Sequence, residues 1–248
     1  MGWLGTEITR PGPGVAKNEP PKRGLSRWWE ILRRDYLALL FINTCFLAGM
    51  LPAAVLAVLG LLDGNGPLLL AAAVLTVLAG PGWTAVNRLC MQMVRDVPFF
   101  TWHYFKKAYR ENLRRGLAGG VLAAAVSLTL LYAARVSFGT RGFALPVLGC
   151  LALAGYLGGG TLLFLFMQIP MVELPFGGLL RNSILLVFAG GWRSVAAILV
   201  PAAATGICIY FYNLALPALL LGGPAVLCMT SCLVYWPKFE AFFMEPQG

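Results

Sequence analysis

Long runs of apolar residues constrain the fold of this chain more than any other feature. A helix needs about 20 mostly apolar residues to cross the roughly 30 Å hydrocarbon core of a bilayer. Six runs approach this length, and they cover residues 37–62, 67–86, 117–134, 143–167, 195–212 and 216–236. Helices satisfy their own backbone groups in an environment without water. The sequence therefore predicts an all-α, polytopic transmembrane helix bundle of about six spans, with a tight hairpin over residues 213–217 between the last two.

The composition excludes the soluble alternatives. Only 12% of the residues are charged and 59% are hydrophobic, whereas soluble domains carry about 25% charged residues. So little charge cannot cover a surface that faces water, which excludes a soluble enzyme, a disordered protein and a fibrous one. Two glycine pairs, Gly116–Gly120 and Gly155–Gly159, have the GxxxG spacing that lets helices approach closely. They predict a compact bundle.

The basic residues indicate how the bundle is oriented. Residues 17–34 hold six Lys and Arg, and the segment between the second and third runs holds seven. The turn after the first run holds none, and the turn after the third holds only two. Because cytoplasmic loops collect Lys and Arg, we expect both termini in the cytoplasm and the protein in the cell inner membrane. This topology explains the net charge of +9 without nucleic acid.

The chain divides into a tail and one membrane domain. Residues 1–24 are polar and rich in proline, so we expect a flexible tail and no secretory signal. Residues 25–240 form the expected transmembrane helical domain.

The first basic segment, GLSRWWEILRRDY, is typical of an amphipathic helix on the cytoplasmic side. Its apolar residues follow helical spacing on one stripe: Leu25, Trp28, Trp29, Leu32 and Tyr36. Tryptophan beside arginine favours the level of the lipid headgroups. We expect either a membrane-surface anchor or a docking helix for a partner, with Trp28, Trp29, Arg33 and Arg34 as contact residues.

The second basic segment, residues 96–116, predicts another amphipathic helix on the same side. Its apolar stripe consists of Trp102, Phe105, Tyr109 and Leu113. Pro98 suits the first turn of such a helix, where a missing N–H is harmless. The expected membrane or partner contacts are Trp102, Phe105, Lys106, Lys107, Tyr109 and Arg110.

Residues 168–193 combine prolines and glycines with a short apolar run, residues 184–189. That run is too short to span a bilayer, so we expect it to lie along the cytoplasmic interface or to re-enter the membrane. Glu173 and Arg181 carry opposite charges and could pair. Polar residues at membrane depth are functional candidates, and the candidate polar site comprises Asn43, Gln168, Glu173, Arg181 and Asn213.

No motif for catalysis or cofactor binding is present. The chain lacks GxxxxGK[ST] and HExxH, has a single histidine, His103, and contains six cysteines without a CxxC pair. We therefore expect no catalytic residue, no metal site and no cofactor. The cysteines are interpreted as free thiols that pack as small hydrophobic groups.

Two blocks of the sequence resemble the YesL family of small bacterial membrane proteins. The first block runs through GPGWTAVNRLCMQMVRD and FFTWHYFKKAYRENLRRG (residues 80–116), after Asn43 and Pro52, and the second is MVELPFGGLLRNSILL (residues 171–186). The resemblance implies an accessory protein of an ABC-type oligosaccharide importer in Gram-positive bacteria, and it supplies no catalytic residues. Glu173 is followed by Leu and Pro instead of two alanines, so we do not expect the permease itself.

The resulting functional hypothesis is a non-enzymatic membrane accessory protein of an ABC-type carbohydrate importer. Its expected partners are membrane lipid and the permease or ATPase subunits of the importer. Two alternatives remain open at this point: an autonomous small transporter or channel, and a membrane-bound regulatory or lipid-binding scaffold whose basic helices bind anionic headgroups.

Overall fold

The described part of the chain is entirely helical. A computed structural model describes residues 24–139 and 145–243, apart from some side chains within the helices, and no strand occurs in these two ranges. The all-α prediction is confirmed for this part. The helices are α1 (Leu25–Leu62), α2 (Gly66–Val77), α3 (Ala79–Val94), α4 (Thr101–Glu111), α5 (Leu113–Gly139), α6 (Leu145–Gln168), α7 (Phe176–Ala189), α8 (Trp192–Tyr210), α9 (Tyr212–Leu220) and α10 (Gly223–Phe243).

Four helical stretches are long and apolar enough to cross a membrane. They are Leu25–Leu62, Gly66–Val94, Leu113–Ala134 and Pro146–Gln168. A fifth arises if α7 and α8 form one broken span, although they are bent by 98° relative to each other. The described helices therefore support a membrane protein with four or five such stretches, whereas the sequence predicts about six. The expected sixth run is divided between α9 and α10.

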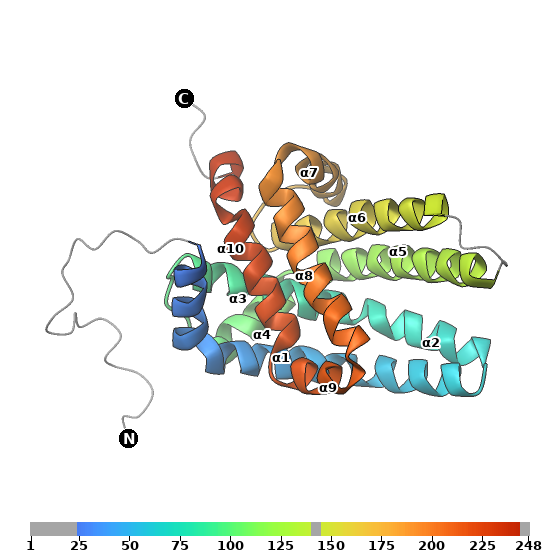
Figure 1. Cartoon of the computed structure of the whole chain (residues 1–248). Coiled ribbons are helices and arrows are strands. Elements are labelled where there is room, and N and C mark those ends of the chain that lie inside the picture. The colour runs from blue at the N-terminus through green and yellow to red at the C-terminus, as the bar shows by residue number, and fades with distance from the viewer. Residues whose placement is uncertain (1–23, 140–144, 244–248) are drawn as a thin grey trace, which may run out of the picture.

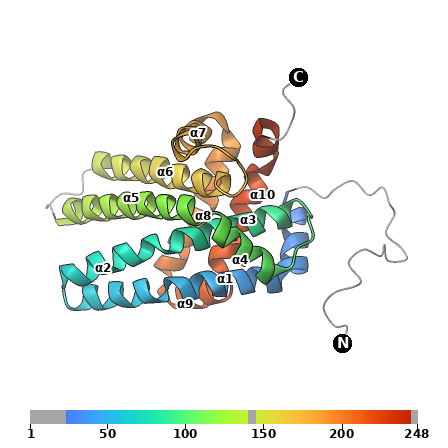
Figure 2. The same cartoon turned by 180° about the vertical axis from the view of Figure 1, so that it is seen from behind.

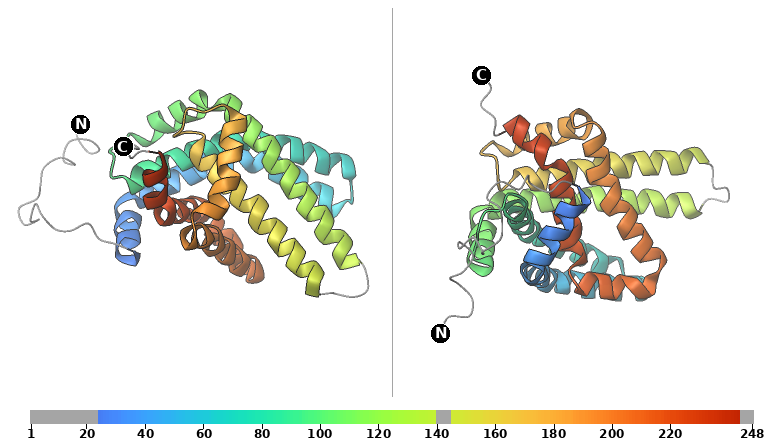
Figure 3. Two further views of the ribbon diagram at one scale, coloured as in Figure 1. Left: turned by 90° about the horizontal axis from the view of Figure 1, so that it is seen from above. Right: turned by 60° about the vertical axis from the view of Figure 1, so that its left-hand side comes forward.

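The long helices form two sets with different directions. Figure 1 shows α1, α2, α5 and α6 running side by side, while α8 and α10 cross them obliquely. Figure 2 shows α4 on the opposite face, close to α1 and α3. The first turns of α1, the C-terminal end of α3, α4 and the C-terminal end of α10 lie toward one end of the molecule, which we call the basic end. In Figure 3, α5 and α6 extend away from it as a pair.

The two amphipathic segments differ from their predicted form. The first is not a separate helix but the start of the 38-residue helix α1, whose first turns are inclined to the rest in Figure 1. The second begins at Thr101, so Pro98 precedes the helix, and it ends at Glu111. The Asn112 side chain donates to the carbonyl of Ala108 at 3.0 Å, and such local bonds compete with helix continuation. Leu113, predicted on this helix, begins α5.

The connection before α10 also differs from the prediction. Residues 213–217 lie within helix α9, so the predicted hairpin there is wrong. The chain turns instead at Gly222, whose φ of 100° is a conformation that glycine adopts without steric cost. The short run at residues 184–189 belongs to α7, and a second glycine turn at Gly190–Gly191 separates it from α8. The Ser194 hydroxyl donates across that turn to the carbonyl of Leu186 at 2.6 Å.

The closest helix contact joins α2 and α3 to α5 through glycines. A Cβ atom on Gly80 would lie 2.1 Å from the carbonyl oxygen of Gly116, and one on Gly120 would lie 2.4 Å from that of Val77. Both distances are far inside van der Waals contact, so the backbones meet without side chains between them. Thus one predicted GxxxG pair, Gly116–Gly120, lies at a helix crossing. Gly155 and Gly159 have no neighbouring atom within 4 Å of an added Cβ.

Alanine substitution distinguishes the two glycine pairs. Gly120→Ala forces the backbones of α2 and α5 apart, so we expect a loss of about 1–3 kcal/mol in unfolding free energy, as for other overpacked sites. Thermal unfolding in mild detergent measures it. Gly155→Ala is the matched control, because its methyl group enters open space and alanine favours a helix. Equal melting temperatures for the two variants would contradict the close crossing.

Candidate apolar binding cavity

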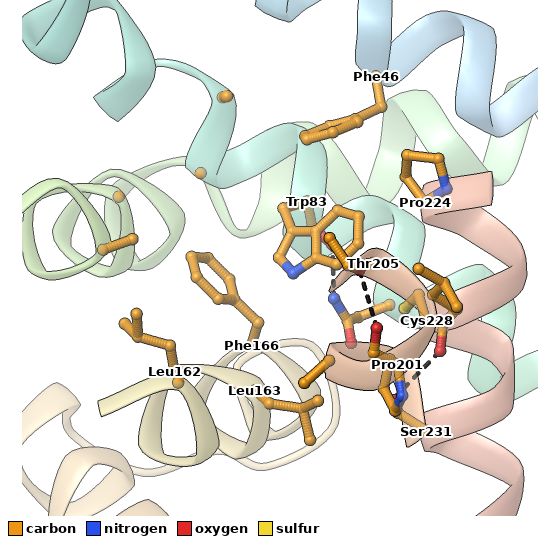
Figure 4. Close-up of a pocket in the computed structure, with 18 of the residues that line it drawn as sticks. Phe46, Trp83, Leu162, Leu163, Phe166, Pro201, Thr205, Pro224, Cys228 and Ser231 are labelled. Carbon is orange, nitrogen blue, oxygen red and sulfur yellow. Dashed lines mark hydrogen bonds between the residues drawn. The ribbon is translucent and has the colours of Figure 1, made fainter. Parts of the chain in front are cut away.

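A cavity of about 540 Å³ lies between the long helices and the crossing pair α8 and α10. Ligand pockets in proteins commonly have volumes of about 300–1,000 Å³. Six long elements and α2 contribute side chains, some of which Figure 4 shows. The lining residues are Phe46, Met50, Thr76, Ala79, Gly80, Trp83, Asn87, Gly120, Ala123, Gly155, Gly159, Leu162, Leu163, Phe166, Ile198, Pro201, Ala202, Thr205, Pro224, Leu227, Cys228 and Ser231.

The cavity wall is apolar and uncharged. None of the described residues that line it is Asp, Glu, Lys, Arg or His. The hydroxyl groups of Thr76, Thr205 and Ser231 each donate to a backbone carbonyl at 2.8–2.9 Å. These donors are therefore already satisfied within the protein. The cavity suits an apolar molecule much better than an ion.

Glycine on α6 accounts for much of the open space. Gly155 and Gly159 line the cavity, and an added Cβ at either position would meet nothing within 4 Å. Just beyond them, Gly160 is packed tightly, since its Cβ would lie 2.5 Å from the side chain of Ile198 on α8. α6 and α8 are thus in close contact at Gly160 and separated beside Gly155 and Gly159.

The cavity opens between α6 and α8. Three of its lining residues are exposed, namely Gly159 on α6 and Ala202 and Thr205 on α8. Large apolar side chains on the outer surfaces of the same helices are also exposed, among them Leu153 and Leu199. The opening is therefore surrounded by the kind of surface that faces lipid.

Trp83 and Asn87 add an indole N–H and an amide to the wall. They lie four residues apart on α3, a spacing that places side chains on one face of a helix. The Asn87 amide nitrogen donates to the carbonyl of Trp83 at 2.9 Å. The Trp83 ring lies 5.0 Å from that of Phe46. Figure 4 shows the indole directed into the cavity, opposite Phe166.

Sequence reasoning missed this site. It singled out neither Trp83 nor Asn87, although both lie in residues 80–116, which resemble the YesL family. The available signal was the helical spacing of Gly80, Trp83 and Asn87 on one face of α3. The cavity itself depends on contacts between distant helices, which a single sequence does not display.

The predicted aromatic contact residues divide between core and surface. Trp28 packs against the core and donates from its indole to the Thr230 hydroxyl on α10 at 2.9 Å, while Trp29 beside it is exposed. On α4, Phe105 is buried and Tyr109 packs partly against the core. Trp102 is 58% exposed and makes an edge contact with Phe41.

The predicted basic contact residues lie at the basic end. Arg33 stacks over Trp29 at 5.6 Å. Lys106 and Lys107 are exposed, and the ammonium group of Lys107 lies 3.8 Å from the Glu111 carboxylate. Arg110 lines a second hollow of about 850 Å³, where its neighbours include Arg88, Arg114, Arg115, Glu111 and Glu173.

The predicted polar site is not assembled as one group. Asn43 on α1 donates to the carbonyl of Leu219 at 2.9 Å, and Gln168 donates to the Ser183 hydroxyl at 2.8 Å. Neither lines the cavity. Glu173 and Arg181 are both exposed, and no ion pair joins these two described residues, so the pairing that their charges allow does not form. The side chain of Asn213 lies outside the described residues.

Arg34 belongs to an ionic cluster that fixes the start of α1. Its guanidinium and that of Arg27 both contact the Asp96 carboxylate. Arg34 also donates to the carbonyl of Met93 at 3.0 Å, at the last turn of α3. Asp96 adopts a φ of 57°, which turns its side chain toward the two arginines.

The cysteines and histidine provide no metal site within the described residues. Cys90, Cys228 and Cys232 are buried in the core between α3 and α10. Each of the six cysteines is a free thiol in the structure, as the sequence predicted.

Asp96 makes stability depend on pH. Partial burial raises the pKa of its carboxyl, but hydrogen bonds and charges from Arg34 and Arg27 outweigh this and lower the pKa overall. The stabilisation is therefore complete above the unfolded value of about 3.9 and is lost as the pH falls through the lower folded pKa. We expect Asp96→Asn, which tolerates the same backbone conformation, to lower the melting temperature at pH 7 but much less at pH 3. A difference that is equal at both pH values would contradict the ionic cluster.

No family model, curated protein or solved structure was found to match this chain.

Proposed function

We propose that this protein is a non-enzymatic membrane protein that binds a lipid or another apolar molecule entering from the bilayer. The observation that carries the proposal is the uncharged cavity of about 540 Å³ that opens between α6 and α8. It differs from the lipid-binding scaffold that the sequence left open, whose basic helices would bind anionic headgroups.

The wall chemistry supports binding of an apolar molecule. Water in such a cavity makes few hydrogen bonds, because the hydroxyl donors of Thr76, Thr205 and Ser231 already have partners. Replacing that water with hydrocarbon is favourable by about 25 cal/mol for each Å² of apolar surface buried. The Phe46, Trp83 and Phe166 rings offer large apolar faces for this contact.

The absence of Asp, Glu, His, Lys and Arg from the described wall favours binding over catalysis or ion transport. General acid–base catalysis needs a group such as His, Asp or Glu within reach of the substrate. Ion pathways through a membrane are normally marked by charged or ionisable side chains. Of the polar residues predicted for a transport pathway, Asn43, Gln168, Glu173 and Arg181 lie outside the described cavity wall, so we do not propose an autonomous transporter.

For orientation, we propose that the basic end faces the cytoplasm of a bacterial inner membrane. The Lys and Arg residues of residues 24–34 and 88–115 gather toward this end, and the positive-inside rule then places it in the cytoplasm. The exposed side chains Trp29, Phe100 and Trp102 near the same end suit the headgroup level.

Filling the cavity tests the proposed function. Gly159→Leu adds a branched side chain at the cavity mouth, where nothing lies within 4 Å of its Cβ. We expect protein purified in mild detergent to lose at least about tenfold of its co-purifying apolar molecule, relative to the original chain, with no loss of thermal stability. Native mass spectrometry and extraction into organic solvent measure the bound molecule.

Gly149→Leu is the matched control. Gly149 lies on the same helix, also has open space around it, and does not line the cavity. It adds the same apolar surface elsewhere, so we expect its bound lipid to match that of the original chain. Equal amounts of bound molecule in all three proteins would overturn the proposal.

A second candidate function is the importer accessory that the family resemblance implies. The observation that favours it is an apolar surface at the basic end, where Phe100 is 72% and Trp102 58% exposed. Aromatic residues dominate many protein interfaces. In this proposal α4 contacts a permease or ATPase subunit of an ABC-type carbohydrate importer.

Affinity purification from native membranes tests this second candidate. We expect permease or ATPase subunits to co-purify with the original chain and to be lost on Trp102→Ala. Phe242→Ala is the control, since Phe242 is another exposed aromatic residue but lies on α10. Purification of the protein alone from native lipid would contradict the importer proposal and leave lipid binding unaffected.

A further inference from the structure

Two residues of the cavity wall, four positions apart on α3, carry polar groups without a partner. Among the described residues, the Trp83 indole N–H has no acceptor and the Asn87 amide oxygen has no donor. Both residues line the cavity. Asn87 is 2% exposed as a whole residue, but its amide oxygen is not fully enclosed, unlike those of Asn43 and Gln168, so a molecule in the cavity can reach it.

A ligand is the natural partner for this pair, because buried polar groups are almost always hydrogen-bonded. Elsewhere in the described residues, an unpaired amide oxygen does not coincide with a place in the cavity wall. Asn43, Gln92 and Gln168 also have an unpaired amide oxygen, but none of them lines the cavity. Within the described wall, the other polar side chains are the three hydroxyl groups that donate to backbone carbonyls. The pair on α3 therefore presents the free side-chain N–H groups of the described wall, that of the Trp83 indole and the second one of the Asn87 amide, beside the unpaired Asn87 oxygen.

We infer that the cavity binds an uncharged lipid that carries a hydroxyl group, and that Trp83 and Asn87 bind this hydroxyl. This inference rests on the proposed function. The hydroxyl oxygen accepts the N–H of Trp83, and its hydrogen is donated to the amide oxygen of Asn87. A hydroxyl matches the pair because it accepts and donates through adjacent atoms.

Because the described wall carries no charged side chain, the group of the lipid that lies beside Trp83 and Asn87 is neutral. Burying an ionised carboxylate or phosphate in such a wall is strongly unfavourable without a compensating cation. Arginines at the basic end do not line the cavity. The hydrocarbon part then occupies the space beside Gly155 and Gly159, which leads toward the opening between α6 and α8.

The hydroxyl is tested with three probes that share a chain: dodecan-1-ol, dodecyl methyl ether and dodecane. The alcohol accepts and donates a hydrogen bond, the ether only accepts, and the alkane does neither. Binding of radiolabelled probes to the purified full-length protein in one detergent measures each affinity. The affinity of each probe is expressed relative to that of dodecane for the same protein. Partition of the probes into detergent micelles is the same for every variant, so it cancels when these ratios are compared.

Two variants remove the groups singly. In Asn87→Leu the whole amide, and with it the acceptor, is lost at similar volume, and we expect the alcohol to bind about three- to tenfold more weakly, as for one neutral hydrogen bond. The ether and the alkane are expected to bind as before. In Trp83→Phe the donor is lost, and we expect both the alcohol and the ether to weaken relative to the alkane. Asn87 bonds only within its own helix among the described residues, so the fold does not depend on its side chain.

The outcomes separate this inference from the proposed function. If both variants weaken all three probes equally, or neither changes the alcohol, the hydroxyl inference is overturned. Lipid binding then still stands, provided that Gly159→Leu blocks the probes. If no probe binds the original chain, or if Gly159→Leu binds them all unchanged, the proposed function itself fails.

Discussion

The glycine contact between α3 and α5 is the interaction on which the rest of the bundle depends. Lipid is as apolar as the helices, so close packing of backbones, more than burial from water, holds helices together in a bilayer. At Gly80, Gly116 and Gly120 no side chain separates the backbones. The contact fixes α5 against α3, and α6 lies beside α5 (Figure 2). α6 in turn meets α8 at Gly160, which leaves the cavity enclosed between these contacts.

Polar side chains elsewhere in the bundle join one helix to another. Trp28 links α1 to α10, Asn43 links α1 to α9, and Ser231 links α10 to α8 through the carbonyl of Ala197. Such bonds orient helices where apolar contacts are not directional. Asn87 is different, because it lines the cavity, bonds only to the preceding turn of its own helix, and receives no hydrogen bond on its oxygen from the described residues. That difference separates a ligand-facing group from a structural one.

The sequence predicted the helical, membrane-embedded class correctly because this class follows from local composition. It could not predict which side of a helix meets another helix. Gly116–Gly120 and Gly155–Gly159 share one spacing, yet the first pair forms a crossing and the second lines a cavity, since their partner helices differ. Trp28 and Trp29 are likewise adjacent, but Trp28 shares the inward face of α1 with the buried Ile31, whereas Trp29 lies on another face and is exposed. The candidate site depends on such long-range choices, and so none of its polar residues was predicted.

Because the cavity opens between α6 and α8, its occupancy depends on the concentration of the ligand in the membrane. A molecule that reaches the cavity from hydrocarbon is already removed from water, so burial in the protein gains less than transfer from solution would suggest. Occupancy then follows the mole fraction of the molecule in the membrane, not its dissolved concentration. Molecules that are already dissolved in the membrane differ little in the free energy gained by leaving water. Hydrogen bonds to Trp83 and Asn87 then provide the selectivity among them. The shape of the cavity beside Gly155 and Gly159 determines which of them fit.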